Sequence, residues 1–175
     1  MSQESQVNQV EVPIQLLNGS SLPTYANADD AGCDIRCNLL HVPKGTLFLR
    51  PDRNGDPTKA KASIQPGECI KLPTGVHIAI PAGYVVLALP KSGRAFNMSL
   101  IIANSPGVVD GGYRGEICII FRNVGQSAET IEHGEKVAQL MCIKYEKMEF
   151  ISIEDINAVP SDGRGSKGFG STGVK

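Results

Sequence analysis

Five short stretches of the sequence carry side chains that suit chemistry on phosphate groups. They combine single carboxylates, basic side chains, hydroxyls and one amide with glycines, which let backbone N–H groups approach an anion closely. Phosphoryl chemistry depends on positioned charge more than on a strong base, so this combination suits a phosphorylated ligand. In chain order the stretches read AGCDI (31–35), PKSGRAF (90–96), GVVDGGYRGE (107–116), GEKVAQL (134–140) and RGSKGFGSTG (164–173).

The last stretch belongs to a glycine-rich segment at the end of the sequence. Arg164 offers a bidentate fork for phosphate oxygens, Ser171 and Thr172 add hydroxyl donors, and Phe169 can lie over a planar ring. The segment also matches G-x-G-x-x-G twice, but a dinucleotide-binding fingerprint requires a following helix and a later acidic residue. From the residues alone two interpretations stay open, a phosphate-binding arm and an inert flexible linker.

Three of the inner stretches each place one polar group in a special setting. Asp34 lies in an acidic turn that enters an apolar segment, and Asp110 enters a glycine-rich turn three residues before Tyr113. Either carboxylate can serve a site or simply a turn, where Asp is common. Residues 91–93 combine an ammonium, a hydroxyl and a glycine that can meet a phosphate, or form a plain exit from a strand. Gln139 is an amide inside an apolar run. Two interpretations stay open: the amide faces solvent, or it is buried and has hydrogen-bond partners.

Short apolar segments bounded by glycine and proline must position these side chains, since the chain contains Gly 19 and Pro 11. The segments are rich in β-branched residues and have the length of strands. Only residues 92–98 suggest a turn of helix. The pattern predicts an all-β protein, a sandwich, jelly roll or barrel, with strands over 76–80, 84–89, 117–121 and 137–143.

Length, charge and cysteine content exclude several classes of protein. The 175 residues carry Lys+Arg 17 against Asp+Glu 18, a formal net charge of −1, so we expect one domain and no direct nucleic-acid binding. No apolar run reaches the ~20 residues of a membrane helix. The first ten residues lack a secretory signal, so we expect a cytoplasmic protein (or a nuclear or host-cytoplasmic one if viral) that is not secreted. With Cys 5, we expect reduced thiols instead of disulfides or structural zinc.

Composition divides the chain into three regions. Residues 1–10 are polar and read as a flexible N-terminal tail, and residues 11–159 hold the strand pattern. Within them, residues 51–66 read as a surface excursion with little to bury. Residues 160–175 form the glycine-rich C-terminal arm.

Taken together and in this order, the five stretches resemble the five motifs of the homotrimeric dUTPases, the deoxyuridine triphosphate nucleotidohydrolases. The correspondence runs from about Val12 to the end of the sequence. The resemblance implies a distorted jelly-roll or β-clip subunit and a homotrimer, in which the flexible arm of one chain closes a site built by others. It also implies Mg²⁺ as cofactor and hydrolysis of dUTP to dUMP and pyrophosphate. That reaction limits uracil incorporation into DNA and supplies dUMP for dTMP synthesis.

The resemblance also implies a role for each matching residue. It makes Asp110 the carboxylate that activates water at the α-phosphorus, Gln139 the amide that orients this water, and Asp34 the acid that holds magnesium through water. Tyr113 packs on the deoxyribose and excludes a 2′-hydroxyl. The other substrate-binding residues that it implies are Lys91, Ser92 and Gly93 at the phosphates, Asn104, Val108 and Val109 at uracil and sugar, Cys118 beside the pocket, and Arg164, Phe169, Gly170, Ser171 and Thr172 in the arm.

Two positions depart from the family pattern. Lys91 and Lys136 stand where arginine is usual in the second and fourth motifs. Lysine supplies a point charge in place of a bidentate fork.

Two alternatives belong to other classes. The related dCTP deaminases share the fold but need a glutamate in the strand after the third motif, where Ile120 stands here, and isoleucine cannot transfer a proton. A binding module that acts as a regulator through a protein partner is the other alternative. The five apparently intact motifs favour an active enzyme, which does not exclude a second role.

Overall fold

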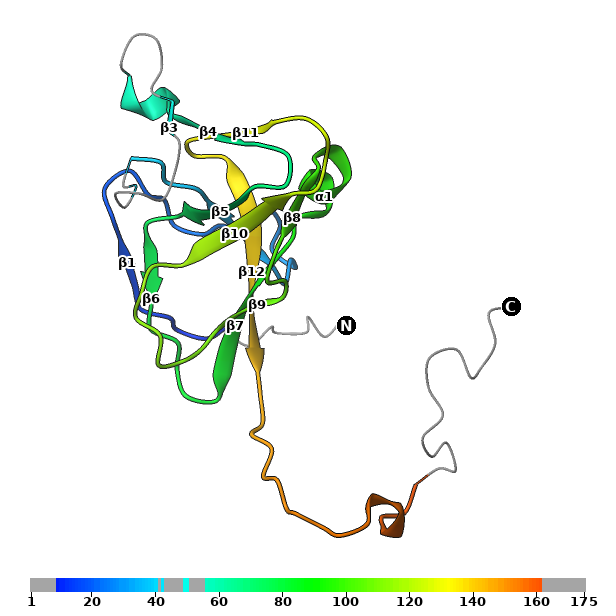
Figure 1. The fold of residues 1–175 in the computed structure, drawn as a ribbon. Coiled ribbons are helices and arrows are strands. Elements are labelled where there is room, and N and C mark those ends of the chain that lie inside the picture. The colour runs from blue at the N-terminus through cyan, green and yellow to red at the C-terminus, as the bar shows by residue number, and fades with distance from the viewer. Residues whose placement is uncertain (1–8, 41, 43–48, 51–55, 162–175) are drawn as a thin grey trace, which may run out of the picture. The chain divides into compact units, whose positions relative to one another are not determined.

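Short antiparallel strands make up almost all regular structure in the residues that this computed structural model describes, 9–40, 42, 49–50 and 56–161 (Figure 1). The chain divides into two units, Met1–Tyr145 and Glu146–Lys175. The α-helix of the first unit, α1, spans Ser92–Asn97. The predicted all-β class is therefore confirmed, and so is the predicted helical turn near residues 92–98.

One four-stranded sheet carries parts of three of the motifs. Its strands are β2 (Cys33–Arg36), β12 (Lys136–Lys144), β7 (Tyr84–Leu89) and β9 (Gly107–Val109), in the order β2-β12-β7-β9. All neighbours are antiparallel. Because β7 lies between β12 and β9, it separates the fourth motif from the third.

The remaining strands form three smaller antiparallel sheets. Strands β5 (Cys69–Pro73), β10 (Cys118–Asn123) and β8 (Leu100–Ile102) pair in the order β5-β10-β8. Strands β11 (Glu129–Glu132), β4 (Lys61–Ile64) and β3 (Leu49–Arg50) form a second sheet. Strands β1 (Ile14–Leu16) and β6 (Val76–Ile78) pair in the third.

The inner faces of these sheets share one apolar core. Strand β10 shows how period-two alternation divides its side chains: Ile119 and Phe121 are each 1% exposed, whereas Cys118 and Ile120 on the opposite face are half-buried. Burying a large apolar side chain contributes about 1.5–3 kcal/mol. The core thus fixes the strand, and its outer face is free to line a site.

The prediction of a surface excursion over residues 51–66 is wrong for its second half. A 3₁₀ turn, η1 (Pro57–Lys59), leads into β4, where Ala62 and Ile64 are fully buried. The small side chains of KASI concealed the alternation; Ala62 and Ile64 pack into the shared apolar core, while β11 pairs with the backbone of β4. Residues 51–55 lie outside the described residues.

The predicted strands agree with the structure at different levels of detail. The strand predicted over 84–89 matches β7, and the one predicted over 137–143 lies within β12. The strand predicted over 76–80 corresponds to β6, which ends two residues earlier, at Ile78. The strand predicted over 117–121 begins one residue later and extends to Asn123.

The second unit, Glu146–Lys175, contains one short 3₁₀ turn among its described residues, η2 (Ile156–Ala158). The Asp155 carboxylate caps this turn and accepts a hydrogen bond from the backbone N–H of Asn157 at 2.9 Å. The predicted arm lies almost wholly outside the described residues, as does most of the predicted N-terminal tail. No helix in the described part of the chain has the length and hydropathy to cross a membrane.

Candidate active site

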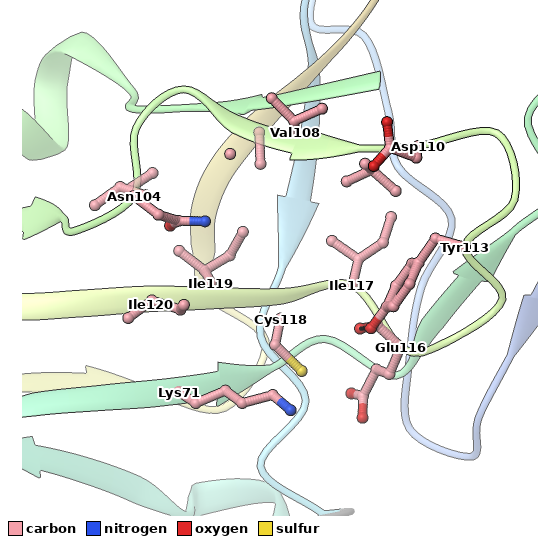
Figure 2. A pocket seen from close by; sticks show the side chains of 14 residues that line it. Lys71, Asn104, Val108, Asp110, Tyr113, Glu116, Ile117, Cys118, Ile119 and Ile120 are labelled. Atoms are coloured by element: carbon pink, nitrogen blue, oxygen red, sulfur yellow. Dashed lines mark hydrogen bonds between the residues drawn. The ribbon is translucent and has the colours of Figure 1, made fainter. Parts of the chain in front are cut away.

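A pocket of about 220 Å³ lies between the hairpin that contains β9 and the start of β10, and Ile117 and Ile119 point from β10 and the residue before it toward that hairpin (Figure 2). The structure brings six predicted site residues together in its lining: Asn104, Val108, Val109, Asp110, Tyr113 and Cys118. Sites for whole small-molecule ligands usually measure about 300–1,000 Å³. The pocket therefore suits part of a ligand, with the remainder extending beyond it.

Glycine shapes the hairpin side of this pocket. Gly107 begins β9, and a Cβ there would lie 3.3 Å from Nδ2 of Asn104 and 3.4 Å from Cβ of Ala88. Its missing side chain leaves room for the Asn104 amide, which can present both a donor and an acceptor. Asn104 and Val108 are exposed, whereas Val109 packs into the core.

The turn after β9 holds both Asp110 and Tyr113. The Tyr113 backbone N–H donates to the Asp110 carbonyl at 3.0 Å, and the Tyr113 hydroxyl donates to the Glu116 carbonyl at 2.9 Å. The ring lies over Gly115, where a Cβ would be 2.5 Å from the ring carbon that bears the hydroxyl. Gly115 is therefore required for this ring position, a role that the glycine-rich motif did not reveal.

Cys118 and Lys71 occupy the lower corner of the pocket in Figure 2. The pKa of the Cys118 thiol is raised to about 11, chiefly by burial and to a lesser degree by the Glu116 charge, while the Lys71 charge acts in the opposite direction. A thiol that stays protonated at neutral pH is a poor nucleophile. Cys118 therefore lines the pocket as a small apolar side chain. Sequence analysis missed Lys71, whose position directly across from Ile120 follows only from the pairing of β5 with β10.

A second cluster surrounds Asp34 on β2. Its carboxylate is 7% exposed, with Oδ2 at 2.7 Å from Nζ of Lys136 and Oδ1 paired with Nζ of Lys91. Burial raises the pKa of the Asp34 carboxyl, but hydrogen bonds and charge from Lys136 and Lys91 outweigh it, so the net pKa lies below its usual value. Asp34 is therefore a charged group held by two cations. Lys136 was noticed in the sequence only as a departure from arginine.

Gln139 lies beside this cluster, because its Cα pairs with that of Asp34 across β12 and β2. Its Nε2 donates to the Pro90 carbonyl at 2.8 Å, so the amide oxygen faces the other way. A Cβ on Gly32 would lie 2.6 Å from that oxygen, so the missing side chain keeps space open beside it. Ser92 and Gly93, both exposed, follow at the start of α1.

Within one chain the pocket and the Asp34 cluster are separate. Along β7, Val109 lies opposite Val86 while Gln139 lies opposite Leu89, on the other side of the strand. Three residue steps of ~3.3 Å and two strand spacings of ~4.8 Å separate the Cα atoms of Val109 and Gln139 by about 14 Å, and Asp110 is one residue further. The Cα atoms of Asp110 and Gln139 are thus about 16 Å apart, and side chains that reach about 3.5 and 5 Å toward each other still leave about 7–8 Å between their polar atoms. A single water bridges groups only about 6 Å apart. Asp110 and Gln139 of one chain therefore cannot hold the same water.

The predicted magnesium position was tested against the groups around Asp34. In the described residues, no three His, Cys, Asp or Glu side chains could ligate a metal ion directly. Asp34 and the Gln139 amide instead offer oxygens from adjacent positions, with space kept beside Gly32. Mg²⁺ prefers oxygen ligands and usually keeps several waters. Lys91 and Lys136 each take one acceptor site on Asp34, and a carboxylate has about four. Asp34 can therefore still accept a hydrogen bond from a magnesium-bound water, and the residues fit a hydrated magnesium ion held through its waters.

Arg164, Phe169, Gly170, Ser171 and Thr172 lie outside the described residues. The remaining predicted site residues divide between the pocket and the cluster of Asp34, Lys91, Ser92, Gly93 and Gln139. The fold and these two clusters define an all-β protein with a small ligand pocket and a separate charged cluster around Asp34.

Comparisons with known proteins identify the family. Residues 58–173 match the sequence profile of the dUTPases. The chain is 35% identical to the deoxyuridine 5′-triphosphate nucleotidohydrolase of Chlamydia abortus, over 92% of this chain and 97% of that protein. It is 34% identical to the Fusobacterium nucleatum protein of the same name, over 95% of this chain and 99% of the other. The chain therefore belongs to the dUTPase family.

Solved structures agree in fold. The dUTPase of Staphylococcus bacteriophage 80alpha, solved with dUpNHpp, superposes with a TM-score of 0.75 at 24% identity, covering 95% of this chain and 100% of that one. The dUTPase of phage phi11 of S. aureus gives a TM-score of 0.67 at 20% identity, covering 86% of this chain and 100% of the other. The predicted jelly-roll fold is confirmed.

Proposed function

We propose that this protein hydrolyses dUTP to dUMP and pyrophosphate. The observation that carries the proposal is the pocket that places Asp110, Tyr113 and Asn104 together in a chain of the dUTPase family. The related proteins of Chlamydia abortus and Fusobacterium nucleatum are named for this activity, and the phage 80alpha enzyme was solved with a dUTP analogue. The reaction would keep dUTP low, which limits uracil in DNA, and would supply dUMP for dTMP synthesis.

The pocket takes the nucleoside part of the substrate. Its volume, below the usual range for a whole ligand, suits a base and sugar, with the triphosphate outside. Asn104 and the backbone near Val108 offer donors and acceptors for the edge of uracil, and a wrong base leaves such groups unpaired. Tyr113 packs on the deoxyribose, where a 2′-hydroxyl would collide with its ring.

The triphosphate of the bound dUTP contacts residues of a second copy of the chain. Asp110 and Gln139 lie too far apart in one chain to act on one water, so a complete site needs the pocket of one copy and the Asp34 cluster of another. This requirement supports a homotrimer with shared sites, since a closed ring gives every pocket a partner. Lys91, Ser92 and Gly93 of the second copy face the phosphates as point charge and donors.

At the α-phosphorus the chain's own groups position and deprotonate water. The Asp110 carboxylate accepts a proton from a water whose oxygen forms the new bond to the α-phosphorus. The bond from this phosphorus to the bridging oxygen breaks, and its electron pair leaves with pyrophosphate. A positioned general base contributes about 10²–10⁴-fold, and the Gln139 amide orients the same water. Asp34, beside the Gln139 amide, would hold a magnesium ion through its waters, and the ion would supply charge neutralisation at the triphosphate.

The C-terminal arm supplies the last group of substrate-binding residues in the proposed site. Arg164, Ser171 and Thr172 clasp the β- and γ-phosphates, and Phe169, beside Gly170, covers the base. Ordering a segment costs about 1–2 kcal/mol per residue, and charge-assisted phosphate contacts can offset this.

Pyrophosphate release from dUTP, dCTP, dTTP and UTP with Mg²⁺ tests the function. We expect turnover of dUTP far above the other three; equal rates on all four, or none on dUTP, contradict the proposal. Asp110→Asn should still bind dUpNHpp while its turnover falls about 10²-fold or more, because the geometry remains and the base is lost.

Mixed trimers test the shared site. Asp110→Asn and Gln139→Ala chains, each inactive alone, are unfolded together and refolded at a one-to-one ratio. If each site takes Asp110 from one chain and Gln139 from another, about a quarter of the sites regain both groups. Recovery of about a quarter of wild-type turnover supports the arrangement, and no recovery in correctly sized trimers contradicts it.

A further inference from the structure

Glu116 lines the pocket and also joins two parts of the chain. Its Oε1 accepts hydrogen bonds from the backbone N–H groups of Thr74 at 2.9 Å and Gly75 at 2.6 Å. The Thr74 hydroxyl donates to the Ile117 carbonyl at 2.5 Å, so a second kind of hydrogen bond joins the same two segments. The turn between β5 and β6 is thereby fixed to the segment that leads into β10.

This contact depends on tight local geometry. Gly75 has a φ of +67°, and a Cβ there would lie 1.9 Å from Oγ of Ser20. Thr74 is 1% exposed, so its backbone N–H has no access to water as an alternative partner. Hydrogen bonds from buried donors to a carboxylate are among the stronger ones in proteins, and removing the acceptor leaves the donors unsatisfied. The Glu116 carboxylate therefore helps to fix the Glu116 backbone relative to this turn, together with the hydrogen bonds that Ile117 makes with Thr74 and with the Val76 carbonyl at 2.8 Å.

The backbone of Glu116 in turn holds Tyr113. The Tyr113 hydroxyl donates to the Glu116 carbonyl at 2.9 Å, and the ring lies over Gly115. Figure 2 shows the ring beside Ile117 with its hydroxyl end directed toward Glu116. Because Tyr113 is 45% exposed, packing fixes its ring only on one side, and the hydrogen bond supplies the remaining constraint.

We propose that Glu116 is a positioning residue for substrate selection: it fixes the carbonyl that holds the Tyr113 ring, and so sets the discrimination between deoxyribo- and ribonucleotides. The inference rests on the proposed function, in which Tyr113 packs on the deoxyribose. Excluding one hydroxyl is a steric effect, and close packing makes such an effect sensitive to small shifts of the excluding group. Glu116 touches no reacting atom, so selection should suffer more than chemistry on dUTP.

The test compares kcat/KM for dUTP with kcat/KM for UTP in wild type and Glu116→Ala. We expect the ratio of the two to fall about tenfold or more, because both backbone donors lose their acceptor. Turnover of dUTP itself should fall by less than the ratio. Equilibrium binding of dUpNHpp and its ribose counterpart should show the same loss of discrimination without any chemistry.

Glu129→Ala is the matched control. The Glu129 carboxylate also accepts a hydrogen bond from a backbone N–H, that of Ser99 at 2.9 Å, but Glu129 does not line the pocket. Its loss should lower stability and leave the dUTP-to-UTP ratio at its wild-type value. The control therefore separates general loosening of the fold from an effect on Tyr113.

The outcomes distinguish the inference from the proposed function. A wild-type protein that does not turn over dUTP contradicts both. A wild-type enzyme that rejects UTP, together with a folded Glu116→Ala variant that rejects it equally, contradicts the inference alone. If Glu116→Ala does not fold, Glu116→Asp decides, because it keeps the charge but is one methylene too short to reach both donors. A lowered ratio in Glu116→Asp supports the inference, and an unchanged ratio overturns it.

Discussion

Replacing Lys136 by methionine measures what the Asp34 cluster contributes to stability. The Asp34 side chain is 7% exposed, while those of Lys91 and Lys136 are 27% and 39% exposed. Breaking a fully buried ion pair costs about 3–5 kcal/mol, whereas an exposed pair is worth about 0–1 kcal/mol. Lys136 is partly exposed and Asp34 keeps Lys91, so we expect Lys136→Met to lower the free energy of unfolding by about 1–2 kcal/mol.

Urea denaturation at pH 7 and one fixed protein concentration provides the measurement, because the apparent stability of an oligomer depends on concentration. Lys61→Met is the control: it removes the ammonium that pairs with Glu132, in a pair whose side chains are 51% and 53% exposed. We expect it to cost less than about 1 kcal/mol.

The cost of Lys136→Met should also depend on pH. The two lysines lower the pKa of Asp34 from 3.8, so their stabilisation is fully present above that value and is lost as pH falls through the folded-state pKa. The difference between wild type and Lys136→Met should therefore be constant from pH 8 to about 5 and shrink in more acidic solution. A Lys136→Met variant that loses no more stability than Lys61→Met at pH 7, or whose deficit grows on acidification, would refute the reasoning.

Two further predictions concern the pocket. Because burial raises the pKa of Cys118 to about 11, its alkylation should be slow at pH 7 and accelerate about tenfold per pH unit toward that value, as peptide mass spectrometry can measure; rapid labelling of this residue at pH 7 would be the contrary result. Gly115→Ala should displace the Tyr113 ring, since a Cβ would lie 2.4 Å from its hydroxyl oxygen, and should weaken dUpNHpp binding in calorimetry; wild-type affinity would show that the ring has another position.

Parts of the fold with strong local signals could be predicted from the sequence. The β7 strand is a continuous apolar run between turn residues, so its bounds were predicted correctly. Strand β4 was missed because alternation over KASI is hidden by small side chains, and its burial depends on the core that the other sheets complete. Strands of three residues, such as β8 and β9, are too short for periodicity to show.

The site was predictable as a set of residues, but its division into two clusters was not. Motif spacing placed Asp110 and Tyr113 together because they share one turn. The separation of Asp110 from Gln139 follows from the strand order β12-β7-β9, which no local pattern specifies. The same holds for Glu116, whose partners Thr74 and Gly75 lie about forty residues away in sequence.

The two departures from the family motifs, Lys91 and Lys136, form one feature around Asp34. A carboxylate has two oxygens, and here each oxygen pairs with a different ammonium, Oδ1 with Lys91 and Oδ2 with Lys136. A guanidinium can take both oxygens of a carboxylate in one fork, whereas an ammonium contacts the carboxylate as a point charge. Two lysine ammonium groups can share the Asp34 carboxylate, because each ammonium needs only one of its oxygens. Because both ammonium groups share one carboxylate, a change from lysine to arginine at either position would alter the contact that the other lysine makes with Asp34.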